Sequence, residues 1–162
     1  MKELLILRHA KSSWSNSYLS DHDRPLNERG RHDAPRMGRL LRTEGLTPDL
    51  IITSSAERAL TTAELVALHS GYEASLQVTR ALYHAGPTTY LAQLRQVDDT
   101  QQRVMVVGHN PGMEELVEEL SGHYEQMSTA SLAHISLPIK RWAECKNSIT
   151  GRLLNLWRPR EI

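Results

Sequence analysis

Two histidines each follow a short apolar run, at widely separated places in the chain. Arg8-His9 comes directly after the run 4–7, and Gly108-His109 comes directly after the run 104–107. Short continuous apolar runs are typical of buried strands, and ligands of open α/β sheets bind at the carboxyl ends of the strands. We therefore expect both imidazoles and the Arg8 guanidinium to meet at one edge of a sheet.

A third predicted strand end adds a second guanidinium. The segment 54–59, which contains Arg58, follows the apolar run 50–52. We expect Arg58 in the first turn of a helix, where its charge opposes the helix macrodipole and needs a compensating partner. A bound phosphate would be such a partner, and the plainer alternative is an ion pair with Glu57 or Glu64. Two imidazoles and two guanidiniums suit a nucleophile that acts on a phosphoryl group.

Each of these side chains has a chemical role in such a site. Neutral His9 can attack phosphorus, and a phosphohistidine intermediate divides one hard displacement into two easier ones. Arg8 can bind phosphate oxygens through two N–H groups. His109 is either a structural histidine or a ligand of the phosphoryl group, and the helix expected after Asn110 favours an anion there. Ser54 could also donate to that anion, although serines at helix starts are usually caps.

Composition limits the classes of protein that fit. The 162 residues suit a single domain spanning 1–162. Lys and Arg together number 19, as do Asp and Glu, so a general nucleic-acid or membrane-surface binder is not expected. The single cysteine, Cys145, excludes an intrachain disulfide. No apolar stretch is long enough for a signal peptide or a membrane span, and we expect a soluble, cytoplasmic protein.

The expected elements alternate between strand and helix over most of the chain. Strands are predicted at 3–8, 49–53, 76–78 and 103–107, and helices at 27–45, 56–70, 88–97 and 111–120. Two further strands, 130–137 and 151–157, have no helix predicted between them. This order predicts an α/β three-layer sandwich with a mostly parallel central sheet, helices on both faces and an antiparallel edge.

Three local features make this prediction more specific. The polar segment 10–26 is expected to be a long, functional loop. Pro35 is expected to kink the first helix or to make it start again. The second helix is expected to bury one face, made of Leu60, Ala63, Leu65 and Leu68.

Four segments resemble the motif blocks of the histidine phosphatase superfamily, whose members include phosphoglycerate mutase-like enzymes. Leu7-Arg8-His9-Ala10 resembles the R-H-G block, with Ala for the usual Gly, and the segment 23–27 with Gly30 resembles the next block. Ser54, Arg58-Ala59 and Thr62-Ala63-Glu64 resemble the block S-x-x-x-R-A-x-x-T-A-E, and 107–110 resembles the second-histidine block. The short length and the R-H-A-K-S-S-W start look like SixA-type phosphohistidine phosphatases.

The resemblance implies that His9 is the nucleophile and that Arg8, Arg58 and His109 complete the phosphate pocket. Larger members carry an acidic residue that protonates the leaving group, whereas the corresponding segment here, 80–85, has no carboxylate. An alkoxide leaving group would then be slow, because general acid catalysis contributes roughly 10²–10⁴-fold. The nitrogen of a phosphoramidate is protonated more easily. The missing acid therefore favours phosphohistidine on a protein, with His84 or water as the remaining candidates for the acid.

The function predicted from the sequence is a phosphatase that hydrolyses phosphohistidine through a covalent intermediate. Its partner would be a phosphorylated protein or a small phosphorylated substrate, with Arg8, Arg58, His109, Ser54 and Asn110 as the binding residues. Two alternatives stay open, namely a small-molecule phosphomonoesterase or mutase of the same superfamily and a non-catalytic module that binds a phosphorylated ligand. No metal or cofactor is expected, because consecutive ligand types such as those of 21–23 rarely converge on one metal, and activity should survive EDTA.

Overall fold

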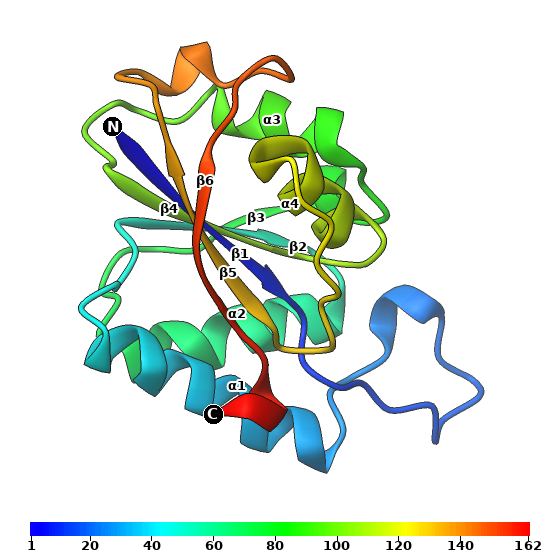
Figure 1. Ribbon diagram of the computed structural model, residues 1–162. Helices are drawn as coiled ribbons and strands as arrows, with labels where there is room; N and C mark the ends of the chain where they lie inside the picture. Colours follow the sequence, from blue (N-terminus) through cyan, green and yellow to red (C-terminus); the bar gives the residue numbers. More distant parts are fainter.

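A six-stranded sheet forms the centre of the computed structural model, which describes residues 1–162 (Figure 1). The strands are β1 (Lys2–Arg8), β2 (Leu50–Ser54), β3 (Gln77–Thr79), β4 (Arg103–Gly108), β5 (Leu132–Leu137) and β6 (Arg152–Trp157). They lie in the order β3-β2-β4-β1-β5-β6. The first four in this order are parallel, while β5 and β6 are antiparallel to their neighbours. The predicted antiparallel edge is therefore confirmed.

Helices cover both faces of the sheet (Figure 1). They are α1 (Glu28–Thr43), α2 (Glu57–Ser70), α3 (Pro87–Leu94) and α4 (Gly112–Ser121). Short 3-10 turns lie at Asp21–Asp23, Arg80–Leu82, Trp142–Glu144 and Pro159–Glu161. One apolar cluster packs α1 and α2 on the sheet, and a second packs α3 and α4 on its other face. This arrangement confirms the three-layer sandwich. None of these helices is both long and apolar enough to cross a membrane.

The central strands are apolar without interruption because both of their faces are buried. In β1, Leu4 and Ile6 belong to the cluster under α3 and α4, whereas Leu5 and Leu7 belong to the cluster under α1 and α2. Burial on both faces is characteristic of parallel strands covered by helices. The same pairing aligns the strand ends, because Arg8 of β1 lies opposite Gly108 of β4.

Helix α1 begins where the sequence indicates, but it is not interrupted at Pro35. The Asn27 side chain accepts a hydrogen bond from the backbone N–H of Gly30 at 2.9 Å, and Gly45 follows the helix with a φ of 69°. Pro35 lies inside α1, which is continuous from Glu28 to Thr43. Of the two expected outcomes, the restart was therefore wrong, and the kink stays a prediction. Packing of α1 against α2 and the sheet stabilises the helix across the hydrogen bond that proline cannot donate.

The buried face of α2 also differs from the prediction. Leu68 is 73% exposed, and Leu60 and Leu65 are only half-buried. Ala63 is buried as expected, and it shares that face with smaller residues, namely Ala59, Thr62 and Val66. The prediction selected the largest apolar side chains, whereas the structure buries a narrower row of small ones.

Close contact between α1 and α2 explains this choice. A Cβ atom added at Gly38 of α1 would lie 2.8 Å from the Cβ of His69 and 2.9 Å from the carbonyl oxygen of Val66. Helix axes can approach this closely only where the residues at the crossing are small. A leucine-lined face on α2 would hold the two helices further apart.

Candidate active site

The ends of three parallel strands bring the predicted residues together. Strands β1, β2 and β4 end at Arg8, Ser54 and Gly108. The ring centroids of His9 and His109 are 5.1 Å apart. A cavity of about 240 Å³ opens here, and its lining includes Arg8, His9, Arg58 and His109. The predicted convergence of the two imidazoles and two guanidiniums is present in the structure.

The ring of His9 is held in one orientation and one tautomer. Its Nδ1 lies 2.7 Å from the carbonyl oxygen of Ala10. Because a carbonyl oxygen only accepts, Nδ1 carries the proton and Nε2 keeps its lone pair. The backbone is fixed on both sides, since the His9 N–H donates to the Gly108 carbonyl at 3.0 Å and the Ala10 N–H donates to Thr62 Oγ1 at 3.0 Å. Nε2, with its free lone pair, is therefore positioned without any bound ligand.

Burial keeps this imidazole neutral. Desolvation lowers the pKa of His9 to about 3, and the nearby His109, Arg8 and Arg58 lower it further, whereas the hydrogen bond to Ala10 opposes the shift. A protonated imidazole has no lone pair with which to attack phosphorus. His9 is therefore in its nucleophilic form throughout the neutral pH range.

His109 is held by Ser54 at the back of the site. Its Nε2 lies 2.8 Å from Ser54 Oγ, and that hydroxyl also accepts a hydrogen bond from the Ala56 N–H at 3.2 Å. Desolvation, followed by the charge of Arg58, lowers the pKa of His109 to about 3. Ser54 is completely buried and does not line the cavity. The structure therefore places Ser54 against His109, and not at the surface where a substrate would bind.

Arg8 and Asn110 meet at the carbonyl oxygen of Met127. Arg8 Nη1 donates to this oxygen at 3.0 Å, and Asn110 Nδ2 donates to it at 2.9 Å. The other end of the Asn110 amide accepts from the backbone N–H of Glu114 at 3.3 Å, in the first turn of α4. The Nε of Arg8 is buried and has no partner. Both residues line the cavity, although the Asn110 amide is already engaged by protein.

The partner of Arg58 is Asp21, from the loop between β1 and α1. Arg58 Nη1 donates to the Asp21 carbonyl oxygen at 2.6 Å, and Nη2 donates to its Oδ2 at 3.0 Å. The sequence-based alternatives, Glu57 and Glu64, were therefore wrong. Arg58 does have the compensating anion that its position in the first turn of α2 requires, and that anion belongs to the protein itself.

The Asp21 carboxylate is held ionised. Tyr83 Oη donates to Oδ2, and Arg24 Nη1 donates to Oδ1 at 2.9 Å. The hydrogen bond from Tyr83 is the largest cause that keeps the pKa of Asp21 well below its usual range, followed on the same side by the contacts from Arg24 and Arg58. In this arrangement Asp21 is an anion and cannot supply a proton.

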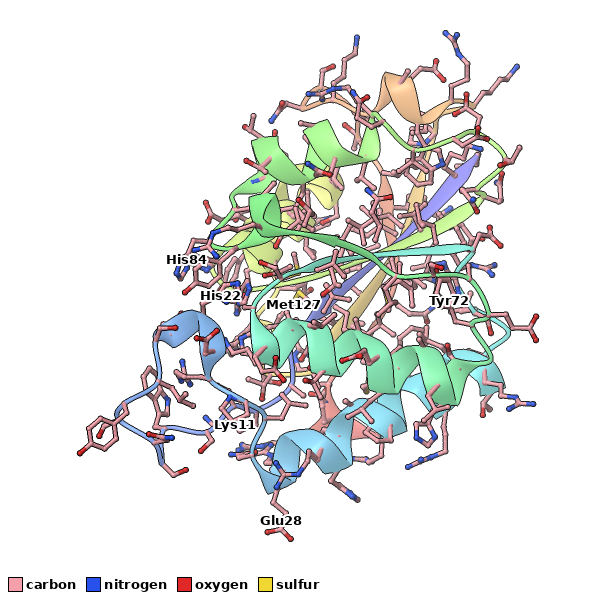
Figure 2. The ribbon with its side chains drawn as sticks, turned by 180° about the vertical axis from the view of Figure 1, so that it is seen from behind. Lys11, His22, Glu28, Tyr72, His84 and Met127 are labelled. Atoms are coloured by element: carbon pink, nitrogen blue, oxygen red, sulfur yellow. The ribbon has the colours of Figure 1, made fainter.

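Sequence reasoning missed Asp21, Tyr83 and Thr62. In the sequence, Asp21 stands out only as a possible metal ligand, and the segment that corresponds to the family's acid is 80–85. The unsatisfied charge of Arg58, together with the acidic turn in a long polar loop, was the signal that could have linked the two segments. His84, the candidate acid, lines the cavity, with its Nε2 3.8 Å from Asp21 Oδ2. Figure 2 shows His84 beside His22, on the side of the molecule where this loop lies.

The structure contains no group of three or more His, Cys, Asp or Glu side chains arranged to hold a metal ion. Asp21 and His22 instead contact other partners, since His22 Nε2 lies 2.9 Å from Ser55 Oγ. Survival of activity in EDTA stays a prediction.

Comparison with known proteins assigns the chain to a family. Residues 4–83 match the model of the histidine phosphatase superfamily, branch 1. An uncharacterised chloroplastic protein of Arabidopsis thaliana is 33% identical over 152 residues, which cover 88% of this chain and 70% of that protein. The structure of a SixA protein of Agrobacterium tumefaciens, assigned by name to the phosphohistidine phosphatases, superposes with a TM-score of 0.81. It is 28% identical, and the match covers 98% of each chain.

A 2,3-bisphosphoglycerate-dependent phosphoglycerate mutase of Streptomyces avermitilis matches over a shorter segment. The two are 43% identical over 65 residues, which cover 39% of this chain and 26% of the mutase. The chain belongs to the histidine phosphatase superfamily, and its fold is that of the phosphoglycerate mutase-like proteins. Its activity is accordingly that of a phosphatase.

Proposed function

We propose that this phosphatase hydrolyses phosphohistidine carried by another protein, through a phosphoenzyme intermediate on His9. The observation that carries the proposal is the state of His9, whose Nδ1–H is engaged by the Ala10 carbonyl. Its Nε2 is left as a neutral nucleophile in a cavity that the Arg8 and Arg58 guanidiniums also line. The name of the Agrobacterium tumefaciens SixA protein supports the same substrate class.

The first step transfers the phosphoryl group to His9. Nε2 attacks phosphorus in line, and the bond from phosphorus to the leaving imidazole nitrogen breaks. Charge on the three equatorial oxygens is stabilised by the guanidiniums of Arg8 and Arg58 and by His109. For this purpose Arg58 exchanges the Asp21 carboxylate for the phosphoryl oxygens.

The second step releases phosphate. Water attacks phosphorus, the bond from phosphorus to His9 Nε2 breaks, and the electron pair returns to the imidazole. The water protons remain on phosphate or pass to solvent, and His9 is again neutral. The cycle consumes one water and needs no other co-reactant.

The ionised state of the carboxylate near His9 favours a nitrogen leaving group. Asp21 is the nearby carboxylate, and its contacts with Tyr83, Arg24 and Arg58 keep it ionised. An alkoxide would leave without a carboxylic acid to protonate it, and such general acid catalysis raises the rate by roughly 10²–10⁴-fold. A phosphorylated imidazole can take a proton on its own ring and leave as a neutral molecule. Phosphoramidates therefore suit this site better than alkyl esters.

A comparison of leaving groups tests the proposal. We expect kcat/KM for a phosphohistidine peptide and for phosphoramidate to exceed that for glycerol phosphate by roughly the 10²–10⁴-fold that an acid supplies. An activated aryl phosphate should fall between them or match the phosphoramidates. Comparable values for alkyl and phosphoramidate substrates would contradict the proposal and favour a small-molecule phosphomonoesterase, and His84→Ala would then show whether His84 is the acid.

Trapping of a phosphoenzyme separates catalysis from mere binding. Rapid quenching after mixing with ³²P-labelled phosphohistidine peptide should leave an alkali-stable, acid-labile label on His9. Turnover without such a label would refute the covalent route, and binding without turnover would identify a non-catalytic module. Isomerisation of phosphoglycerate with retention of the phosphoryl group would identify a mutase.

A further inference from the structure

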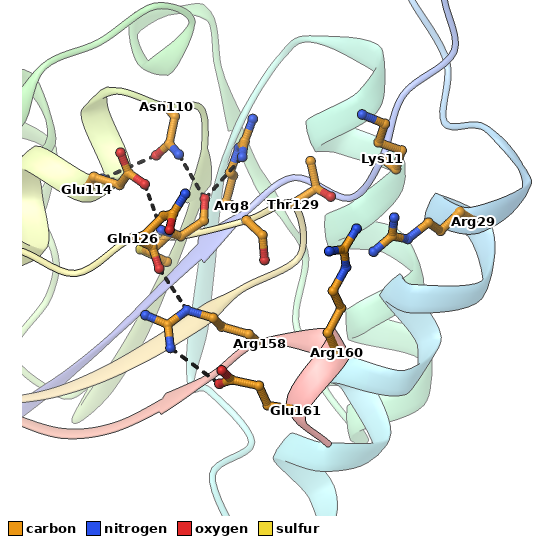
Figure 3. Close-up of a pocket in the computed structure, with 12 residues that line it drawn as sticks. Arg8, Lys11, Arg29, Asn110, Glu114, Gln126, Thr129, Arg158, Arg160 and Glu161 are labelled. Atoms are coloured by element: carbon orange, nitrogen blue, oxygen red, sulfur yellow. Dashed lines mark hydrogen bonds and ion pairs between the residues drawn. The ribbon is translucent and has the colours of Figure 1, made fainter.

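A second, larger cavity adjoins the site. It measures about 510 Å³ and lies between α1, α4 and the 3-10 turn Pro159–Glu161 (Figure 3). Four lining residues are common to both cavities, namely Arg8, Lys11, Asn110 and Thr129. A substrate whose phosphoryl group lies at His9 therefore has this cavity beside it.

The carboxylates that line this cavity are already engaged. Glu114 Oε2 accepts a hydrogen bond from the backbone N–H of Met127 at 2.7 Å. Glu161 pairs with Arg158 at 3.3 Å, and Glu125, which lies outside the cavity lining, pairs with the same guanidinium at 3.3 Å. The charge of Arg158 is thus compensated by protein, and these acids are not available to the other cations of the cavity.

Three cations of the cavity lack comparable partners. Lys11 and Arg160 form no ion pair or side-chain hydrogen bond in the structure. Arg29 has only a 3.5 Å contact with Asp33, a carboxylate that Arg36 also contacts at 3.2 Å. Figure 3 shows the guanidiniums of Arg29 and Arg160 side by side, with Lys11 on the neighbouring loop segment at the same end of the cavity. Such a group of like charges produces a local positive potential that attracts an anion.

The backbone positions of Arg160 and Arg29 are set by a fixed turn and by a helix end, respectively. Arg36 Nη2 donates to the carbonyl oxygens of Pro159 at 3.2 Å and of Ile162 at 3.0 Å, which fixes the turn that carries Arg160 against α1. Arg29 lies in the first turn of α1, where a cation opposes the helix macrodipole and an anion is favoured. A bound anion would compensate both the helix end and the guanidiniums.

We propose that Lys11, Arg29 and Arg160 form a subsite for a carboxylate side chain that neighbours the phosphohistidine on its protein substrate. This inference rests on the proposed function and specifies its substrate class, namely phosphohistidine on an acidic surface. The phosphoryl group binds Arg8 and Arg58, and the carboxylate binds the adjoining cations. A second phosphate would share this chemistry, and the experiment below distinguishes the two sources.

Two phosphohistidine peptides test the subsite. They differ only in whether the flanking residues are Asp and Glu or Asn and Gln. We expect kcat/KM at low salt to favour the acidic peptide by roughly three- to tenfold, as two exposed ion pairs would give. The double variant Arg29→Ala/Arg160→Ala should bring this ratio close to one. The matched control is Arg39→Ala/Arg42→Ala, two exposed arginines of α1 that do not line the cavity, and it should keep the wild-type ratio.

Salt and substrate controls separate the outcomes. The preference of the wild-type protein should shrink as salt is raised, because exposed charges are screened. Phosphoramidate has no flanking residues, so failure to turn it over refutes the proposed function itself. Turnover of phosphoramidate with equal kcat/KM for the two peptides, or a preference that survives in Arg29→Ala/Arg160→Ala, overturns only the subsite. Strong competition by pyrophosphate without discrimination between peptides would assign the subsite to a second phosphate and overturn the carboxylate proposal.

Discussion

The reactivity of His9 depends on two conditions that its surroundings impose on the ring. The Ala10 carbonyl selects the tautomer, and desolvation keeps the ring neutral. Arg8 and Arg58 add positive charge without donating a proton to His9. An imidazole in this environment suits the proposed role of nucleophile toward an anionic electrophile, because the guanidiniums would attract the phosphoryl group that Nε2 attacks.

Replacement of His9, the proposed nucleophile, should separate chemistry from binding. In His9→Ala we expect turnover of phosphoramidate to fall by at least roughly 10³-fold, because the covalent step is lost. The affinity for inorganic phosphate should change little, since Arg8 and Arg58 remain. Isothermal titration and steady-state assays measure the two quantities, and Arg58→Ala is the control that should weaken phosphate binding. Near wild-type turnover in His9→Ala would show that another residue is the nucleophile.

The pH profile should reflect the depressed pKa of His9. A free histidine would lose nucleophilicity below about pH 6.5. Because the pKa of His9 is lowered to about 3, kcat/KM for a stable aryl phosphate should show no fall through pH 6.5, and the decline should come at lower pH. If kcat/KM fell with a midpoint near pH 6.5 while the ¹⁵N signals of His9 did not titrate there, that midpoint would be assigned to the substrate. A His9 signal that titrates near 6.5 would contradict the effect of burial.

At the scale of elements, the start of α1 is packed directly on the loop that follows His9. A Cβ at Gly30 would overlap the carbonyl oxygen of Lys11 and lie 3.0 Å from its backbone nitrogen. In the other direction, the Asn27 N–H donates to the same carbonyl at 3.0 Å. This contact explains why a glycine stands three residues after the helix cap, in a block that otherwise carries polar side chains.

Gly30→Ala should therefore damage both stability and activity. Alanine favours helices, so the change would be stabilising in an open helix. Here we expect a loss of about 1–3 kcal/mol in the free energy of unfolding, as overpacked sites show, together with lower kcat because Lys11 is close to His9. Gly86→Ala is the control, since nothing lies within 4 Å of the added Cβ. Urea unfolding that leaves Gly30→Ala as stable as Gly86→Ala would contradict this account.

At the scale of the whole molecule, the net charge is balanced but the basic residues are unevenly distributed. The chain carries 19 basic and 19 acidic residues, yet Arg8, Lys11, Arg58 and Arg160 line two adjoining cavities. The sheet places these cations together because parallel strands end at one edge, with the loops of both helical layers above it. Two buried neutral histidines in the same region make the fold sensitive to acid.

Stability should fall on acidification from about pH 6.5. The pKa values of His9 and His109 are lowered to about 3 in the folded state, so the unfolded chain binds more protons between these pH values, and the free energy of unfolding decreases as pH drops. We expect a loss of about 1–2 kcal/mol per histidine between pH 7 and pH 5. Urea unfolding in phosphate-free buffer measures it. The stability of the variant His9→Gln/His109→Gln should depend less on pH, and the control His32→Gln, at an exposed histidine, should behave as wild type. Equal stability of the wild-type protein at pH 7 and pH 5 would refute the lowered pKa values of the two histidines.

The sequence by itself determined that four residues of the site meet at one sheet edge. Arg8, His9, Arg58 and His109 each follow an apolar run, and such runs become buried parallel strands whose ends coincide. The four-helix, mostly parallel architecture with its antiparallel edge follows from the same local patterns, because burial on both faces leaves a continuous apolar signal in the chain. These features depend on residues that are close together in the chain, so the local pattern of a single sequence is enough to predict them.

Only the tertiary structure decided how side chains from different layers pair. The contact of Arg58 with Asp21, the burial of Ser54 against His109 and the small-residue face of α2 depend on distances between segments that no local pattern encodes. The same holds for the cations beside the site, since Arg29 and Arg160 come from distant parts of the chain. Local patterns indicate where strands and helices lie, whereas the packing of whole layers selects the buried helix faces and the side-chain pairs. Close approach and charge compensation must be satisfied together in that packing.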